Sequence, residues 1–472
     1  MRASAIVQVY EAASLVCDII GKGDHALKAA RSLRRIMRTI SLVALILVWM
    51  AGMGHTAPIV TVSSWSLRYV EPLVEAFNAK GLGIEAEAVQ LRPDALKARL
   101  ITNLAPDIIM YTVGDFDYEW EHYWLDLTEV VKRLGSRGDW LPGTWDALTI
   151  PAGPYKGEIR RIKNTYEVPV LYYDKDQMAN AGVMEPADMH RAGRWSWEDM
   201  LSLAKKLTRD LNGDGLTDVW GLAHDISHGW KSSGYYEIWG LQAGEYFVSP
   251  DGYYRGNQPA FVDMVQWWAD LYNVHHVMQS PRPGVSTLPS GLSAMIMYGT
   301  HLHASADWRE FRTWDMAPLP NLPQNKAYNY MFEHGAWVVN KNCADIDATM
   351  KFVEFLLSPE AVQIMSREVG FFPVRLSVAR EFANYQQERY PWAKNVAYTI
   401  ISMVEGTMLP TKPGPWYMPN WNDVRDHMHA AVRSVLAGEV PAAVALEQVA
   451  GPIESILAAG RKDMIAGTLW KW

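Results

Sequence analysis

Shortly after residue 57 the chain alternates between β-branched runs and amphipathic segments, and this alternation limits the possible folds more than any other feature. The pattern predicts strands at 59–63, 84–89 and 108–113 and helices at 71–78 and 94–103. Parallel strands need a helical crossover between them, so this order predicts a doubly wound α/β lobe.

A chain of 472 residues is too long for one ordinary compact core, and this length suits two lobes. Beyond the first lobe, the pattern predicts a strand at 168–173 and helices at 197–208, 263–272, 348–357, 424–436 and 443–457. The sequence shows neither an internal repeat nor a low-complexity linker. The predicted fold class is therefore α/β, with two lobes.

The charge and the aromatic content point to a class of ligand. The net charge of −8 argues against nucleic acid, because a phosphate backbone needs a basic partner. The chain holds 21 Trp and 22 Tyr, and a surplus of such rings often lines concave sites for ligands with flat apolar faces.

The N-terminal region has the features of an export signal. Four arginines between residues 31 and 38 precede an apolar core at 40–51, and small residues follow up to Ala57. This order is typical of a secretory signal, and the apolar core is shorter than a membrane span. We therefore expect 1–57 to be a leader, with an uncleaved anchor as the alternative. The sequence leaves two translation starts open, Met1 and Met37.

Cysteine usage agrees with export. Cys17 lies in the leader, so the exported chain keeps only Cys343 and forms no internal disulfide. Because no cysteine follows the apolar core, a lipid anchor is not expected, and we expect a free periplasmic protein.

Seven short motifs follow one another in the order found in one family. The chain resembles the family 1 extracellular solute-binding proteins of ABC importers, the group that includes maltose-binding proteins. The motifs are 105–108 (APDI), 125–128 (LDLT), 168–176 (VPVLYYDKD), 195–200 (WSWEDM), 291–299 (GLSAMIMYG), 352–361 (FVEFLLSPEA) and 370–375 (GFFPVR). Asp174 stands where the family usually has asparagine.

The resemblance implies a type II periplasmic binding protein fold, with a ligand cleft between two lobes. Three crossings join the lobes, near 167–169, 333–336 and 372–375. It places 58–168 and 336–372 in the N-terminal lobe and 169–335 and 373–472 in the C-terminal lobe. It also implies a carbohydrate ligand, the membrane permease of an ABC transporter as partner, and a monomer without enzymatic activity.

Candidate ligand-binding residues lie at strand ends and near the crossings. Trp65 and Asp115 follow the first and third predicted strands, where a ring face and a carboxylate can meet a sugar. The resemblance adds Trp230, Tyr235, Glu237, His301, Glu333, Trp337, Arg375 and Trp421. At each position the alternative is a structural role: core packing for the aromatic residues, a turn for Asp115 and an ion pair for Arg375.

One loop carries part of a calcium-binding pattern. Asp210, Asn212, Asp214 and Asp218 alternate as oxygen ligands do in such loops, with Gly215 at the sixth position. Position twelve is Gly221, so the usual bidentate glutamate is missing. The sequence leaves two interpretations open, a calcium site or a polar turn. No other cofactor is expected.

Three other functions remain compatible with the sequence. A secreted carbohydrate-active enzyme would need a pair of carboxylates, and the sequence shows no recognisable pair. A sensor that presents its ligand to a membrane receptor would have the same sequence features. The ligand can also be a polyol or a phosphorylated polyol, which Arg or Lys in the cleft would indicate.

Overall fold

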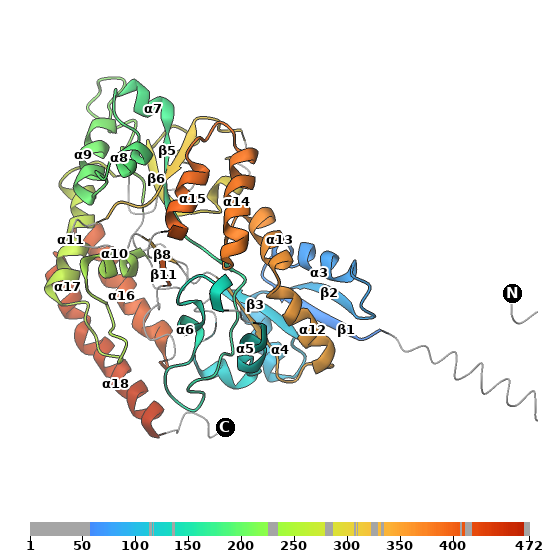
Figure 1. The fold of residues 1–472 in the computed structure, drawn as a ribbon. Helices are drawn as coiled ribbons and strands as arrows, with labels where there is room; N and C mark the ends of the chain where they lie inside the picture. The colour runs from blue at the N-terminus through green and yellow to red at the C-terminus, as the bar shows by residue number, and fades with distance from the viewer. Residues whose placement is uncertain are drawn as a thin grey trace, which may run out of the picture. The chain divides into compact units, whose positions relative to one another are not determined.

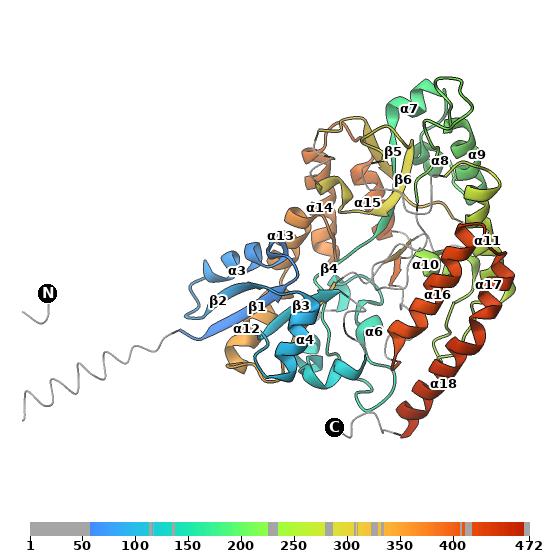
Figure 2. The same ribbon diagram turned by 180° about the vertical axis from the view of Figure 1, so that it is seen from behind.

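The computed structural model describes residues 57–112, 116, 118–134, 137–224, 235–278, 287–305, 308, 310–321, 329–331, 335–405, 408–410 and 418–466. Contacts divide the chain into Met1–Ala57 and a compact unit, Pro58–Trp472. The compact unit contains two main sheets with helices packed on both faces of each (Figures 1 and 2).

The first sheet has four strands in the order β2, β1, β3, β9. They are β2 (Glu85–Gln90), β1 (Ile59–Ser64), β3 (Ile108–Thr112) and β9 (Gly335–Val339). β1 is parallel to β2 and to β3, whereas β9 is antiparallel to β3. Helices α3 (Glu71–Asn78) and α4 (Pro93–Ile101) connect the parallel strands, as the alternation predicted.

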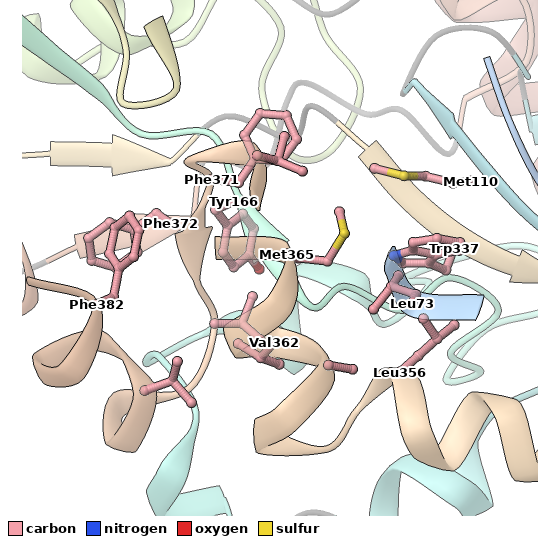
Figure 3. Packing of buried hydrophobic residues seen from close by; sticks show 14 of the residues in the cluster. Leu73, Met110, Tyr166, Trp337, Leu356, Val362, Met365, Phe371, Phe372 and Phe382 are labelled. Atoms are coloured by element: carbon pink, nitrogen blue, oxygen red, sulfur yellow. The ribbon is translucent and has the colours of Figure 1, made fainter. Parts of the chain in front are cut away.

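Alternating side chains of this sheet enter two different cores. Val62 and Trp337 face the first core, which also holds residues of α3, α12 (Ile346–Leu356) and α13 (Pro359–Val369). Figure 3 shows Leu73, Trp337 and Met365 converging there. Ile109 and Tyr111 face the opposite side, against α4. Burial on both faces explains the continuous apolar run of β3.

The second sheet has three antiparallel strands in the order β6, β5, β7. They are β6 (Met295–Gly299), β5 (Pro169–Asp174) and β7 (Trp314–Ala317). Tyr172 joins the first core beside α14 (Leu376–Arg389) and α15 (Val396–Glu405), whereas Leu171 and Tyr173 join a second core.

Helices from the middle and the end of the chain build the second core. They are α7 (Lys175–Asn180), α8 (Pro186–Arg191), α9 (Trp197–Leu207), α10 (Tyr235–Ala243), α11 (Pro259–Asn273), α16 (Trp421–Leu436), α17 (Ala442–Gln448) and α18 (Ala450–Ala466). Within the described residues, the stretch 442–462 is long and apolar enough to cross a membrane. Its Leu446, Ile453 and Leu457 are buried in this core.

Paired segments lie where the chain passes from the first sheet to the second. Ile162 still pairs with Trp337 of β9, and β4 (Thr165–Tyr166) then leads into β5. β4 pairs antiparallel with β10 (Phe372–Pro373), so two of the predicted crossings run side by side. The third predicted crossing, 333–336, lies partly outside the described residues. The exact lobe boundaries stay a prediction.

Shorter elements complete the fold: α5 (Thr128–Leu134), α6 (Thr144–Leu148), β8 (Asn329–Met331) and β11 (Met408–Pro410). The predicted strands and helices are all present. The predicted helix 443–457 is instead two helices, α17 and α18, which meet at Val449. Pro452 in the first turn of α18 explains the break, because proline is tolerated at a helix start but disrupts a helix interior.

Candidate functional site

Trp65 directly follows β1, at the carboxyl end of the first sheet. Its side chain is half-buried, and a Cβ on Gly335 at the start of β9 would lie 3.5 Å from its Cη2 atom. Trp65 therefore lies beside the ends of both β1 and β9. Ligands of open α/β sheets bind at this edge.

A row of aromatic rings runs from Trp65 to His301, which follows β6 of the second sheet. The Trp65 and Tyr69 ring centroids are 4.9 Å apart. Tyr69 stacks on Phe371 at 5.9 Å with an angle of 10°, and Phe371 meets the His301 ring at 5.1 Å. We call Trp65, Tyr69, Phe371 and His301 the aromatic row. It joins residues of the two sheets.

Glu167 and Tyr298 lie beside the His301 end of the row. The Tyr298 and His301 ring centroids are 5.7 Å apart, and Glu167 Oε1 is 3.9 Å from His301 Nδ1. A Cβ on Gly299 would clash with the Glu167 side chain, so glycine is needed for this close approach. Burial, with the Glu167 charge as a lesser cause, raises the pKa of both Tyr69 and Tyr298.

These groups combine flat ring faces with hydrogen-bonding atoms. Trp65, Tyr69, Tyr298 and His301 are all half-buried, so each keeps part of its surface accessible. The raised pKa values keep the two phenols protonated, and a protonated phenol both donates and accepts hydrogen bonds. Glu167 adds a carboxylate acceptor. The set suits a neutral ligand with apolar faces and hydroxyl groups.

Three candidates from the sequence occupy structural positions. Trp337 is 1% exposed, and its Nε1 donates to Asn164 Oδ1 at 3.0 Å. Trp421 is buried in the second core against Phe247. The Arg375 guanidinium donates to the Leu357 carbonyl and to Asp139 Oδ2, and it covers Trp140. For all three this is the structural role that the sequence left open.

Tyr235 and Glu237 lie in α10 and are buried with the second core. The Tyr235 ring is 4.6 Å from the ring of His224. Asp115, Trp230 and Glu333 lie outside the described residues, so their roles stay predictions.

Four members of the site were not among the sequence candidates: Tyr69, Glu167, Tyr298 and Phe371. Tyr69 lies one turn beyond Trp65, and Glu167 and Phe371 border predicted crossings. Proximity to Trp65 or to a predicted crossing is the signal by which the sequence could have indicated these three residues. The approach of Tyr298 to Glu167 depends on the pairing of β5 with β6, which no local pattern specifies.

The candidate calcium loop is an exposed turn held by its own hydrogen bonds. Asp210 accepts the backbone N–H groups of Asn212, Gly213 and Gly215, and these bonds lower its pKa. Asp214 and Asp218 accept the N–H groups of Leu216 and Leu211. No group of three acidic, His or Cys side chains suited to a metal occurs within the described residues.

An open surface pocket of about 240 Å³ lies elsewhere, beside α8 and α9. Its lining includes Met184, Met189, Leu203, Arg194 and Lys206 and contains no aromatic side chain. Because it offers no ring face for a sugar, we assign the candidate site to the aromatic row instead.

Comparison with protein families gives a match over most of the fold. The model of the bacterial extracellular solute-binding proteins matches residues 72–400. The chain belongs to this family. Its members are extracellular proteins that bind solutes. A search of curated protein sequences gave no match.

Solved structures with the same two-lobed fold include sugar-binding proteins of ABC importers. A Listeria monocytogenes substrate-binding protein in complex with cycloalternan has a TM-score of 0.67 at 19% identity, over 85% of this chain and 98% of that one. The maltodextrin-binding domain of Bdellovibrio bacteriovorus bound to maltotriose gives 0.62 at 18%, over 85% and 99%. UgpB of Mycobacterium tuberculosis in complex with glycerophosphocholine gives 0.67 at 14%, over 85% and 98%.

Proposed function

We propose that this protein captures a carbohydrate at the aromatic row and delivers it to the membrane permease of an ABC importer. The observation that carries the proposal is that half-buried rings at the ends of both sheets are linked into one row through Phe371, with Glu167 beside its His301 end. Bound sugars in the similar structures from Listeria and Bdellovibrio support the class of ligand.

The chemistry of the row favours a sugar over a charged ligand. Sugar rings have apolar C–H faces that stack on Trp and Tyr, and their hydroxyls exchange hydrogen bonds with phenols and carboxylates. Glu167 would repel a phosphate placed beside His301. A neutral sugar therefore suits this end of the row better than a phosphorylated polyol.

A thermal-shift screen over sugars, polyols and glycerophosphodiesters tests the class of ligand. A compound that binds only the folded state raises the melting temperature. We expect an oligosaccharide to give the largest shift, and calorimetry then gives its Kd. A shift with a glycerophosphodiester and with no sugar would contradict the carbohydrate assignment.

The proposal includes export of a monomer to the periplasm. The compact unit begins at Pro58, directly after the expected leader. We expect the N-terminus of the protein isolated from the periplasm to lie near Pro58. N-terminal sequencing checks this, and a cytoplasmic protein that keeps Met1 would contradict it.

The proposal also includes the absence of catalysis. We expect a bound oligosaccharide to be recovered unchanged after long incubation with pure protein. Turnover that is lost in the Glu167→Gln variant would instead favour a carbohydrate-active enzyme, because such an enzyme needs cleft carboxylates.

A further inference from the structure

The segment Gly370–Phe371 lies against residues that follow β6 of the second sheet. Gly370 ends α13 with a φ of +83°, a left-handed conformation that glycine adopts without strain. A Cβ at this position would lie 3.2 Å from His301 Cα and 3.4 Å from Ala304 Cβ. The backbone therefore approaches the His301–Ala304 turn without room for a side chain.

The next residue, Phe371, stands in the middle of the aromatic row. One face of its ring stacks on Tyr69, and His301 meets it at an angle of 68°. The ring thus separates Tyr69, which follows β1, from His301, which follows β6. Arg68 donates to the carbonyls of Glu368 and Val369, just before this segment, at 3.4 Å.

Phe371 itself presents almost no surface to a ligand. It is 2% exposed, whereas Trp65, Tyr69 and His301 are half-buried. It also directly precedes β10, which pairs with β4 where the chain passes between the sheets. Any influence of Phe371 on binding must therefore act through the rings that it touches.

We propose that Phe371 is a positioning residue that fixes the spacing and orientation of Tyr69 and His301 for ligand binding. The proposal rests on the proposed function of the aromatic row. Loss of the ring leaves a gap between Tyr69 and His301, and the neighbouring side chains relax partly into such a gap. The ligand-facing rings then lose the geometry that binding requires.

Phe372 provides a matched control. It is the adjacent phenylalanine, it is fully buried, and it belongs to the same core. Its ring packs 6.3 Å from Phe382, and Figure 3 shows it beside Phe382 while Phe371 points to a different side of the segment. Phe371→Ala and Phe372→Ala remove the same atoms from neighbouring positions. A loss of affinity that arises only from the reduced core volume is therefore expected in both variants.

The test combines crystal structures of both variants with calorimetry, using maltotriose and the sugar that gives the largest shift in the screen. We expect both variants to lose a similar amount of melting temperature. In Phe371→Ala we expect Tyr69 or His301 to move by more than about 0.5 Å and Kd to rise by about tenfold or more. In Phe372→Ala we expect both rings to stay and Kd to remain within about twofold.

Two results overturn the positioning role: the rings stay in place in Phe371→Ala, or Phe372→Ala weakens binding equally. If the unmodified protein binds none of the sugars, the proposed function fails. The two crystal structures then still decide whether Phe371 holds Tyr69 and His301 in place.

Discussion

Trp65 is the ring of the candidate site that lies closest to the end of β1, and it is only half-buried. Trp65→Ala removes a large accessible ring face, so we expect ligand binding to weaken by about 1–3 kcal/mol. Isothermal titration calorimetry measures the change. Unchanged affinity would remove Trp65 from the binding surface even though the family is established.

Trp197 serves as the control for that variant. Its ring contacts Trp239, Trp267 and Trp268, and its Nε1 donates to Gln242 Oε1 at 2.9 Å. Trp197→Ala creates a cavity and leaves Gln242 without this donor, so we expect a loss of stability of about 3–5 kcal/mol. The affinity of the folded fraction should stay unchanged.

Residue type alone separates ligand contacts from core positions poorly. Trp65, Trp337 and Trp421 are all candidates in the sequence: Trp65 follows a predicted strand, Trp337 lies beside a predicted crossing, and Trp421 precedes a predicted terminal helix. In the structure only Trp65 of these three keeps exposed surface. The other two are buried within the hydrophobic cores. Local periodicity does not show which helix packs over which residue, since that depends on tertiary contacts.

At the scale of single elements, the loop 210–218 gives a clear expectation for metal binding. Its carboxylates already accept backbone N–H groups, and the twelfth position holds Gly221 instead of a glutamate ligand. We therefore expect the melting temperature to be the same in calcium and in chelator, because a polar turn gains nothing from the ion. A calcium-dependent rise that Asp210→Ala abolishes would establish the calcium site instead.

The buried side chain of Asp315 in β7 links this strand by hydrogen bonds to Asn395, which directly precedes α15. Asp315 accepts hydrogen bonds from the backbone and the side-chain amide of Asn395, and burial raises its pKa from 3.8 to about 6. The folded state thus holds the proton more tightly than the unfolded state. The extra stability that this tightly held proton gives the folded state is complete below pH 3.8, and it is lost as the pH rises through about 6.

The comparison of the protein with Asp315→Asn isolates this effect. Between pH 4 and 6 we expect the free energy of unfolding to fall relative to that of the variant, as measured by urea denaturation. His303 is a separate source of pH dependence, because burial lowers its pKa to about 3. It is present in both proteins and cancels in the difference. Parallel pH profiles would contradict the titration of Asp315.

Helices and strands whose apolar residues recur with a regular period were predictable from the sequence. Elements whose position depends on tertiary contacts were not. The alternation at 59–113 placed β1, α3, β2, α4 and β3 to within about two residues. Helix α10 was not predicted, because its residues 235–243 are buried on nearly all sides, including Glu237 and Gln242, and show no amphipathic period. The pairing of β4 with β10 joins residues far apart in the sequence, and local patterns cannot reveal such contacts.

At the scale of the whole molecule, the chain length and the order of seven motifs predicted the two-lobed fold, which the family match and the similar structures confirm. The sequence predicted three crossings without showing that two of them pair as β4 and β10. That pairing matters for function, since it sets the segment Gly370–Phe371 against the His301 turn.

Closure of the two lobes on the ligand is the prediction that belongs to this scale. The aromatic row contains residues that follow strands of both sheets, so a sugar bound there contacts both lobes and favours the conformation in which they approach. We expect the radius of gyration from small-angle X-ray scattering to fall when the best-binding sugar of the screen is added at saturation.

A sugar that gives no thermal shift is the control and should leave the scattering unchanged. If calorimetry shows tight binding while the radius of gyration stays constant, the lobes do not close. The row would then be a preformed surface and not two walls brought together by the ligand.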